Sequence, residues 1–378
     1  MIPSFLGVEI QSNKIQNNTE STNEEDVINL PKTFCWCDVD GVDYSTPIKN
    51  QAPLPTCEAY ALCAALETMA NYEVGHNFNC DLSEIHLFFC SGGDEAWGVN
   101  VQDAANYLVK YGVPDEGCLP EPRRKAHIPC SETLEGWEER TVKIESWGWV
   151  ENDVESIKQA LVEYGPLVIC NFVRTDFMIY NRGIYRNIWG DIEGGHVMSL
   201  FGYNDVQKYW LIKNSWGKNW GDDGWIKVSY NAHRGLRPFF APFYGGSGIM
   251  YLDGIYGNLQ PDVPRIYIDR PLRGYTYYNF LSWQKSWLRE NYINSNDAII
   301  IKGTLAQLDV SEDTEYVEVY IDKELVDTIT GPVFDWYLSV QDYGLHELRF
   351  IAYNDEDVGS MAMMDVFTVP IEYIFGTK

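Results

Sequence analysis

The distribution of cysteines divides this chain into two parts. There are nine cysteines among its 378 residues, and all of them lie before residue 171. Such a density in one half of a chain is typical of disulfide-bonded proteins from an oxidising compartment. The count is odd, so at least one cysteine has no partner within the chain. The lack of cysteine in the remaining residues indicates a second domain of a different kind.

The pattern of apolar residues supports this division. Residues 1–28 are polar and rich in Asn and Glu without periodicity, which predicts a disordered leader. We expect a globular domain over residues 29–258 and a linker over residues 259–264. A second domain is expected over residues 265–378.

The first domain changes from helices to strands along its length. Apolar residues at helical spacing predict helices in "CEAYALCAALETMANYE", in "NVQDAANYLVKYG" and in "NDVESIKQALVEYG", the last with Asn152 as N-cap. Strands are predicted in "PLVICNF", "HVMSLFGYN", "KYWLIKNS" and "GWIKVSY". From Arg265 onwards only strands are expected, at sandwich-like intervals. The fold class is therefore α+β, followed by an all-β sandwich.

The net charge restricts the partners that the protein can bind. Lys and Arg number 28 against 55 Asp and Glu, which gives a formal charge of -27. Nucleic acid and anionic membranes would be repelled, so we expect no nucleic-acid partner. No apolar run reaches the length of about 18 residues that a membrane span needs. The first residues, "MIPSFLGVEIQ", show no signal peptide, but the cysteines lead us to expect a secreted, extracellular protein.

Four residues in chain order have the chemistry of a thiol nucleophile: Gln51, Cys57, His196 and Asn214. A thiol attacks a carbonyl as thiolate, and its ordinary pKa keeps it protonated at neutral pH. Cys57 follows a Pro-rich loop where a helix would begin, and the partial positive charge of a helix N-terminus favours the thiolate. An imidazole can take the proton, which leaves a thiolate–imidazolium ion pair, and an Asn carbonyl can orient that imidazole. A Gln amide and the Cys57 N–H can bind the oxyanion.

These motifs resemble those of the papain-like cysteine peptidases. The resemblance rests on Gln51 followed by Cys57 at a helix start, "GGHVMSLFGY" with His196, and "KNSWGKNWGDDGWIKV" with Asn214. It implies a two-subdomain fold, with a helical left half and a β-barrel-like right half, that hydrolyses peptide or protein substrates. Cys57 would be the nucleophile, His196 the base and acid, Asn214 the orienting residue and Gln51 the oxyanion donor. Roughly 29 residues precede the matching region, so we expect no folded inhibitory prosegment.

The resemblance also implies a set of substrate-binding residues: Gly98, Cys170, Gly195 and Trp216, of which Trp216 would shield the Asn–His hydrogen bond. Two departures from the family pattern stand out. The nucleophile lies in Pro-Thr-Cys-Glu instead of Gly-Ser-Cys-Trp, and only Gly98 of a Gly-Gly pair is present. The charge of Glu58 would raise the pKa of the adjacent thiol, yet stabilise an imidazolium.

Two other functions are compatible with these departures. One is a catalytically weak or inactive papain-fold module for binding or adhesion. The other is a papain-fold acyl transferase or a cell-wall peptidase. Residues 265–378 resemble the Ig-like modules of secreted prokaryotic proteins, which implies a role in binding a surface or another protein.

The remaining cysteines are assigned by their local pattern. Cys63 and Cys170 lie in apolar stretches and are expected to be buried thiols. Cys35 and Cys37 lack a second Cys/His pair with zinc spacing, so we expect neither a metal nor a cofactor. Four cysteines are expected to form bridges: Cys80, Cys90, Cys118 and Cys130. The family resemblance implies that Cys90 pairs with a cysteine near residues 118–130.

Overall fold

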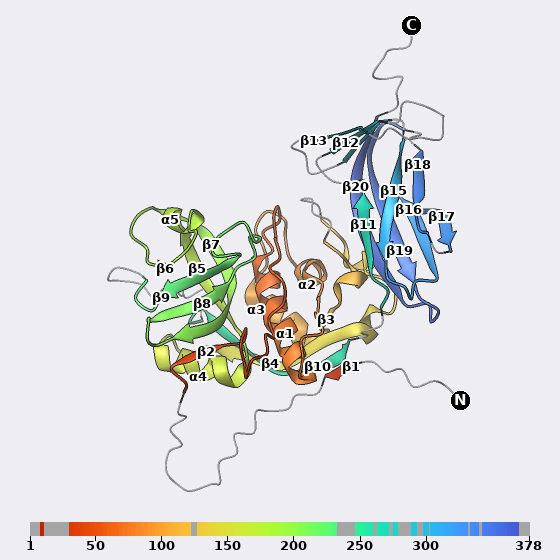
Figure 1. Ribbon diagram of the computed structural model, residues 1–378. Helices are drawn as coiled ribbons and strands as arrows, with labels where there is room; N and C mark the ends of the chain where they lie inside the picture. Colours follow the sequence, from red (N-terminus) through yellow and green to blue (C-terminus); the bar gives the residue numbers. More distant parts are fainter. Residues whose placement is uncertain are drawn as a thin grey trace, which may run out of the picture. The chain divides into compact units, whose positions relative to one another are not determined.

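The structure is a computed structural model, in which the described residues form two compact units (Figure 1). The described ranges are 8–10, 30–121, 127–232, 246–259, 263–271, 275–278, 289–292, 298–301, 303–331, 333–339 and 342–369. Unit 1 comprises Met1–Asp115, His127–Cys130 and Gly136–Gln260. Unit 2 comprises Glu116–Ala126, Ser131–Glu135 and Pro261–Lys378.

Unit 1 combines helices with one large sheet. Its α-helices are α1 (Cys57–Val74), α2 (Glu84–Cys90), α3 (Val101–Lys110), α4 (Val154–Tyr164) and α5 (Thr175–Met178), and a 3-10 turn, η3, covers Trp137–Arg140. Its strands are β1 (Val8–Ile10), β2 (Thr33–Cys35), β3 (Val113–Pro114), β4 (Thr141–Trp149), β5 (Leu167–Arg174), β6 (Ile184–Tyr185), β7 (Ile192–Asn204), β8 (Tyr209–Lys213), β9 (Trp225–Ser229) and β10 (Ile249–Leu259). The sheet order is β3-β4-β10-β5-β7-β8-β9-β6, with β1 paired to β10 and β2 paired to β7.

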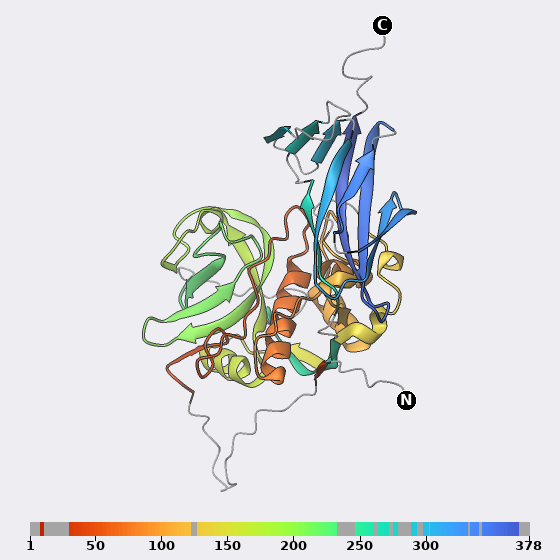
Figure 2. The same cartoon turned by 45° about the vertical axis from the view of Figure 1, so that its right-hand side comes forward.

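Helix α1 lies between the helices α2 and α3 and the strands around β7 (Figures 1 and 2). It packs on α2 and α3 on one side and on β7 on the other. Its sequence is Ala-rich and is buried on nearly all faces, as suits a helix enclosed by other elements. Gly75 ends it in the left-handed conformation, with φ of 82°. A helix placed in this way can carry residues of its first turn to the boundary between the two halves.

Two expectations at element ends are corrected. The N-cap of α4 is Asp153, whose carboxylate accepts hydrogen bonds from the N–H groups of Glu155 and Ser156, and not the expected Asn152. Residues 8–10 form a strand inside the segment expected to be a disordered leader, because Val8–Ile10 pairs antiparallel with β10. The other residues of the expected leader lie outside the described residues.

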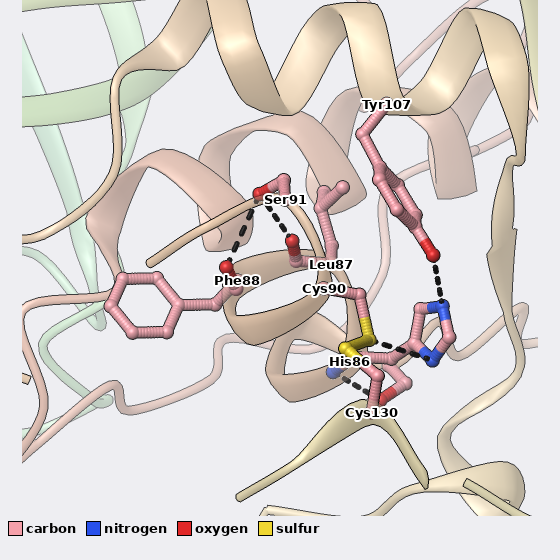
Figure 3. Close-up of a disulfide and its surroundings, with 8 residues drawn as sticks. His86, Leu87, Phe88, Cys90, Ser91, Tyr107 and Cys130 are labelled. Carbon is pink, nitrogen blue, oxygen red and sulfur yellow. Dashed lines mark hydrogen bonds between the residues drawn. A yellow bond between two sulfur atoms is a disulfide. The ribbon is translucent and has the colours of Figure 1, made fainter. Parts of the chain in front are cut away.

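The cysteine pairing is confirmed in part. Cys90 at the end of α2 is bonded to Cys130, within the range that the family resemblance implied (Figure 3). In the same view the ring of His86 lies between the hydroxyl of Tyr107, at 3.1 Å, and the sulfur of Cys90, at 3.7 Å. Burial lowers the pKa of His86 to about 3, so this ring is neutral.

The other bridge expectations were wrong. Cys80 and Cys118 are buried thiols, while Cys35 and Cys37 are bonded to each other. The pairing depends on tertiary distance, which the cysteine spacing does not encode. Cys63 and Cys170 are buried thiols outside any disulfide, as predicted.

Unit 2 is built from two sheets that share one core. Its strands are β11 (Ile266–Arg270), β12 (Tyr275–Tyr278), β13 (Arg289–Tyr292), β14 (Ala298–Ile301), β15 (Gly303–Val310), β16 (Tyr316–Ile321), β17 (Glu324–Thr330), β18 (Trp336–Ser339), β19 (Gly344–Tyr353) and β20 (Gly359–Val369). One sheet has the order β11-β15-β18 and the other β13-β12-β14-β20-β19-β16-β17. Apolar residues of both sheets form a single cluster, including Ala306 and Leu338 from one and Val319 and Phe350 from the other. The all-β class is confirmed, and the Ig-like assignment stays a prediction.

Unit 2 also holds two short segments that precede β4 in the chain. They contain the 3-10 turn η1 (Glu116–Cys118) and part of η2 (Cys130–Glu132). The Glu132 carboxylate forms ion pairs of 2.6 Å with Lys323 and 2.7 Å with Arg349. None of the described helices in either unit is long and apolar enough to cross a membrane.

Candidate active site

Cys57 is the first residue of α1, as the Pro-rich loop before it predicted. Thr56 is at the N-cap position, but its side chain makes no capping hydrogen bond. The N–H groups of a first helical turn have no partner within the helix, and they carry the positive end of the helix dipole. The N–H of Glu58 interacts with the Glu58 carboxyl, so the N–H of Cys57 is the one that can act on a group bound beside the thiol.

Strand β7 runs alongside this end of α1 (Figure 1). The Ser199 hydroxyl donates a hydrogen bond of 2.8 Å to the carbonyl oxygen of Ala61, one helical turn after Cys57. The N–H of Val197 interacts with the Cys57 thiol. Since His196 directly precedes Val197, this packing brings together the predicted nucleophile and the predicted base.

The His196 ring is oriented by Asn214, which follows β8. The Oδ1 atom of Asn214 lies 2.7 Å from Nε2 of His196 and accepts a second hydrogen bond of 2.8 Å from the N–H of Ser215. A backbone N–H can only donate, so the atom facing it is an acceptor, and Nε2 of His196 must carry the hydrogen. In the neutral ring Nδ1 is then the basic nitrogen, which is the tautomer that a general base needs.

Trp216 covers this pair. Its ring stacks on the His196 ring, with 4.7 Å between centroids and 28° between planes. His196 is 4% exposed and Asn214 is 3% exposed, so their hydrogen bond is shielded from water, as the resemblance implied for Trp216. Burial lowers the pKa of His196 to about 4, against the smaller raising effect of its bond to Asn214.

Gln51 is held at the same site by Ser215. Its Oε1 accepts a hydrogen bond of 2.6 Å from the Ser215 hydroxyl, and its Nε2 donates one of 3.2 Å to the carbonyl oxygen of Leu54. An amide nitrogen carries two hydrogens, so one remains for an oxyanion. Ser215 was not singled out from the sequence, although it lies inside the Asn-Ser-Trp-Gly motif.

The electrostatics of Cys57 favour the neutral thiol. Burial raises the pKa of Cys57 well above its ordinary value, and the charge of Glu58 raises it further. Among the described residues, the Cys57 sulfur makes no hydrogen bond with the His196 ring. Burial therefore opposes both members of the predicted ion pair, the Cys57 thiolate and the His196 imidazolium.

The four predicted substrate-binding residues have different positions relative to Cys57. Trp216 stacks on His196, as described above. Cys170 pairs with Val197 across β5 and β7, and Gly195 is exposed beside His196. Gly98 has φ of +85°, and a Cβ there would lie 3.2 Å from Oε1 of Glu58. All four predicted substrate-binding residues therefore lie around the predicted catalytic ones.

A buried ionic cluster lies next to the site, and its connections were not predicted. Lys49 forms ion pairs of 2.8 Å with Glu67 and 2.6 Å with Glu84. The Thr46 hydroxyl donates to Glu67 at 2.6 Å, and Nζ of Lys213 donates to the Thr46 carbonyl at 2.7 Å. Burial raises the pKa of Glu84 to about 8 and lowers that of Lys213 to about 8. Lys49 lies two residues before Gln51, and Lys213 directly precedes Asn214. The cluster therefore holds both of these chain segments in place.

Asn171 on β5 is a further residue that the sequence analysis did not single out. It is fully buried, yet both polar atoms of its side chain lack a hydrogen-bond partner. It pairs in register with His196 on β7, so the two side chains are neighbours on one face of the sheet. The only available sequence signal was a polar residue in the apolar run "LVICNF".

Known proteins resemble the part of the chain that contains this site. Residues 30–237 match the family described as "Papain family cysteine protease". The chain is 30% identical over 167 residues to a Giardia intestinalis protein named "Cathepsin B-like CP2", covering 42% of this chain and 52% of that protein. It is 31% identical over 246 residues to "Cathepsin B-like cysteine proteinase 6" of Caenorhabditis elegans, covering 53% of this chain and 62% of that protein.

A solved structure supports the fold. The chain matches "proCathepsin B S9 from Trypanosoma congolense" with a TM-score of 0.50 and 22% sequence identity, over 64% of this chain and 81% of that chain. The chain spans about half to three fifths of the length of the two curated relatives described above.

Proposed function

Because the chain belongs to the papain family of cysteine proteases, we propose that it is a peptidase that hydrolyses peptide bonds through a thioester on Cys57. Peptides or proteins are the proposed substrates. The alternatives of an inactive binding module and of an acyl transferase have no specific observation in their favour.

One observation carries this proposal: the shielded hydrogen bond between His196 and Asn214 beside the uncapped start of α1. In this hydrogen bond Nε2 of His196 carries the hydrogen, so Nδ1 of the neutral ring can take a proton from the thiol. The start of α1 supports anion binding at Cys57. A nucleophile, a base, an orienting group and oxyanion donors are thus close together.

We derive the reaction from these roles. His196 takes the thiol proton on Nδ1 while the Cys57 sulfur forms a bond to the substrate carbonyl carbon. The resulting oxyanion accepts hydrogen bonds from the Cys57 N–H and from Nε2 of Gln51. The C–N bond then breaks, and the leaving amine takes the proton from His196. Water attacks the thioester with His196 as base, and the acid product leaves with the thiol restored.

We propose that Cys57 and His196 are uncharged before substrate binds, so that the proton moves to His196 while the sulfur attacks the carbonyl carbon. Burial opposes both the thiolate and the imidazolium in the free site. Forming the two opposite charges together, close to each other, is less costly than forming either one alone. We therefore propose general-base activation of Cys57, with the ion pair forming during attack.

Peptide hydrolysis by the Cys57→Ala variant tests the proposal. The matched control is Cys63→Ala, which removes a buried thiol from the same helix. We expect Cys57→Ala to abolish release of new amines from casein and from fluorogenic dipeptides, while Cys63→Ala retains it. Hydrolysis by Cys57→Ala at the rate of the unsubstituted chain would refute the proposal.

The disulfides support a location outside the reducing cytosol. Cys35–Cys37 and Cys90–Cys130 are both bonded in the structure. Such bonds persist in oxidising compartments. We propose on this basis that the protein is secreted, and loss of the Cys90–Cys130 bond in protein isolated from its native source would contradict this.

A further inference from the structure

Glu58 directly follows the proposed nucleophile, and we propose that its carboxyl is a positioning residue that allows the Cys57 thiolate to form only while Glu58 is protonated. The inference rests on the proposed function, because it assigns a pH dependence to the same site. It goes beyond that function in predicting an enzyme that is active on the acid side of neutrality.

The carboxyl of Glu58 is enclosed by the loop that approaches the start of α1. Glu58 is 9% exposed, and its Oε2 atom is buried without a hydrogen-bond partner. The backbone of Gly98 lies so close that an added Cβ would come within 3.2 Å of Oε1 and 3.2 Å of the Pro55 carbonyl oxygen. A charged carboxylate in such a place has lost most of its hydration.

The groups that face this carboxyl compensate its charge only weakly. They are the thiol of Cys57 on α1, the thiol of Cys170 on β5, and the N–H groups of Glu58 and Val99. Among the described residues, no lysine, arginine or histidine forms an ion pair with it. Burial raises the pKa of Glu58 to about 7, against the lowering effect of these N–H groups and of the Cys57 thiol.

The charge of Glu58 acts on the thiol and not on the imidazole. After burial, the charge of Glu58 is the largest cause of the raised pKa of Cys57. It also contributes, after burial, to raising the pKa of Cys170 to about 12. The causes that shift the pKa of His196 are burial and Asn214, with no contribution from Glu58. An ionised Glu58 therefore opposes the thiolate more than it stabilises the imidazolium.

The direction of the pH effect follows from this difference. Below pH 7 Glu58 is mostly neutral, the repulsion disappears, and Cys57 can transfer its proton to His196. As the pH rises through about 7, the carboxylate forms and the thiolate becomes harder to reach. The step involves only proton transfer, from Glu58 to solvent on ionisation and from Cys57 to His196 during attack.

Alkylation of Cys57 in the Glu58→Gln variant tests the inference without requiring peptidase activity. Iodoacetamide labelling of Cys57 is followed by mass spectrometry from pH 5 to pH 8. Glutamine has the shape of the neutral acid, so both chains should react equally at pH 5. At pH 8 the variant should react about tenfold faster or more, which corresponds to a difference of one pKa unit in the thiol. A ratio that stays constant over this range would overturn the inference.

Two additional measurements make the result unambiguous. The matched control is Glu155→Gln, in the first turn of α4, where the side chain is largely exposed and a constant ratio is expected. If Glu58→Gln does not fold, a carbon-13 NMR titration of Glu58 in the unsubstituted chain gives the answer. Ionisation near pH 7 supports the inference, and ionisation near pH 4.5 overturns it.

Failure of the inference and failure of the proposed function are distinguishable. If peptidase activity depends on Cys57 but the ratio of Cys57 labelling between Glu58→Gln and the unsubstituted chain is constant, the proposed function stands and the inference about Glu58 is wrong. If the protein has no peptidase activity but this labelling ratio changes about tenfold, Glu58 does affect Cys57 and the proposed function is wrong.

Discussion

Replacing Asn171 with leucine should stabilise the protein. Asn171 is fully buried, and neither its Nδ2 nor its Oδ1 has a hydrogen-bond partner. An unsatisfied buried polar group costs about 1–3 kcal/mol, and leucine has a similar size without polar atoms. Asn171→Leu should therefore raise the free energy of unfolding by about 1–3 kcal/mol. For a unit of this size, each kcal/mol corresponds to a rise of about 2–4 °C in Tm.

Asn71→Leu is the matched control for this experiment. Asn71 is as deeply buried as Asn171, but its Nδ2 donates to the Tyr44 carbonyl at 3.0 Å and its Oδ1 accepts from the Phe78 N–H at 3.2 Å. The same substitution there removes two hydrogen bonds and leaves both backbone groups without these partners. We expect it to lower the free energy of unfolding by about 1–3 kcal/mol.

Urea denaturation of the two variants and of the unsubstituted chain measures both effects. The predicted result is opposite signs for one chemical change at two buried positions. If Asn171→Leu destabilises the protein as much as Asn71→Leu does, the side chain of Asn171 has a partner and the reasoning is refuted. The rate of peptide hydrolysis by Asn171→Leu shows in addition whether Asn171 helps to orient His196. An unchanged rate would mean that it does not.

Two further predictions concern the stability of unit 1. The double variant Cys90→Ser with Cys130→Ser opens a bridge with a sequence separation of 40, and loop entropy predicts a loss of about 4 kcal/mol in urea denaturation. A loss below about 1 kcal/mol would contradict this account. Lys49→Met leaves the buried carboxylate of Glu67 without its ion pair, and a loss of about 3–5 kcal/mol is expected. Unchanged thermal unfolding of this variant would show that the cluster does not depend on Lys49.

The positions of the proposed catalytic residues could be predicted because their chemistry is encoded in short stretches. Prolines before Cys57 prevent an earlier helix start, and α1 does begin at that residue. Asn214 and Trp216 lie within one tetrapeptide motif, and the structure brings both to His196. The alternation of helical and strand patterns likewise gave the correct α+β class followed by an all-β region.

Features that depend on contacts between distant segments could not be predicted. The expected bridges failed for Cys80 and Cys118 because pairing requires suitable distances in the folded chain. Asn171 looked like an ordinary strand residue, and only its register with His196 gives it significance. The effect of Glu58 on the thiol was expected from adjacency alone, but its burial against Gly98 depends on tertiary structure.

Buried side-chain nitrogen and oxygen atoms without a hydrogen-bond partner indicate where the fold is less stable than it could be. Of the eight such side-chain atoms among the described residues, four belong to Glu58, Asn171 and Asn214. These residues come from three separate segments, and each lies beside Cys57 or His196. A core selected for stability alone would replace them with apolar side chains, since each costs about 1–3 kcal/mol. Natural proteins break such rules mainly at functional sites. Asn171→Leu therefore tests the effect of such a residue on stability, and Glu58→Gln tests the effect of another on the reactivity of Cys57.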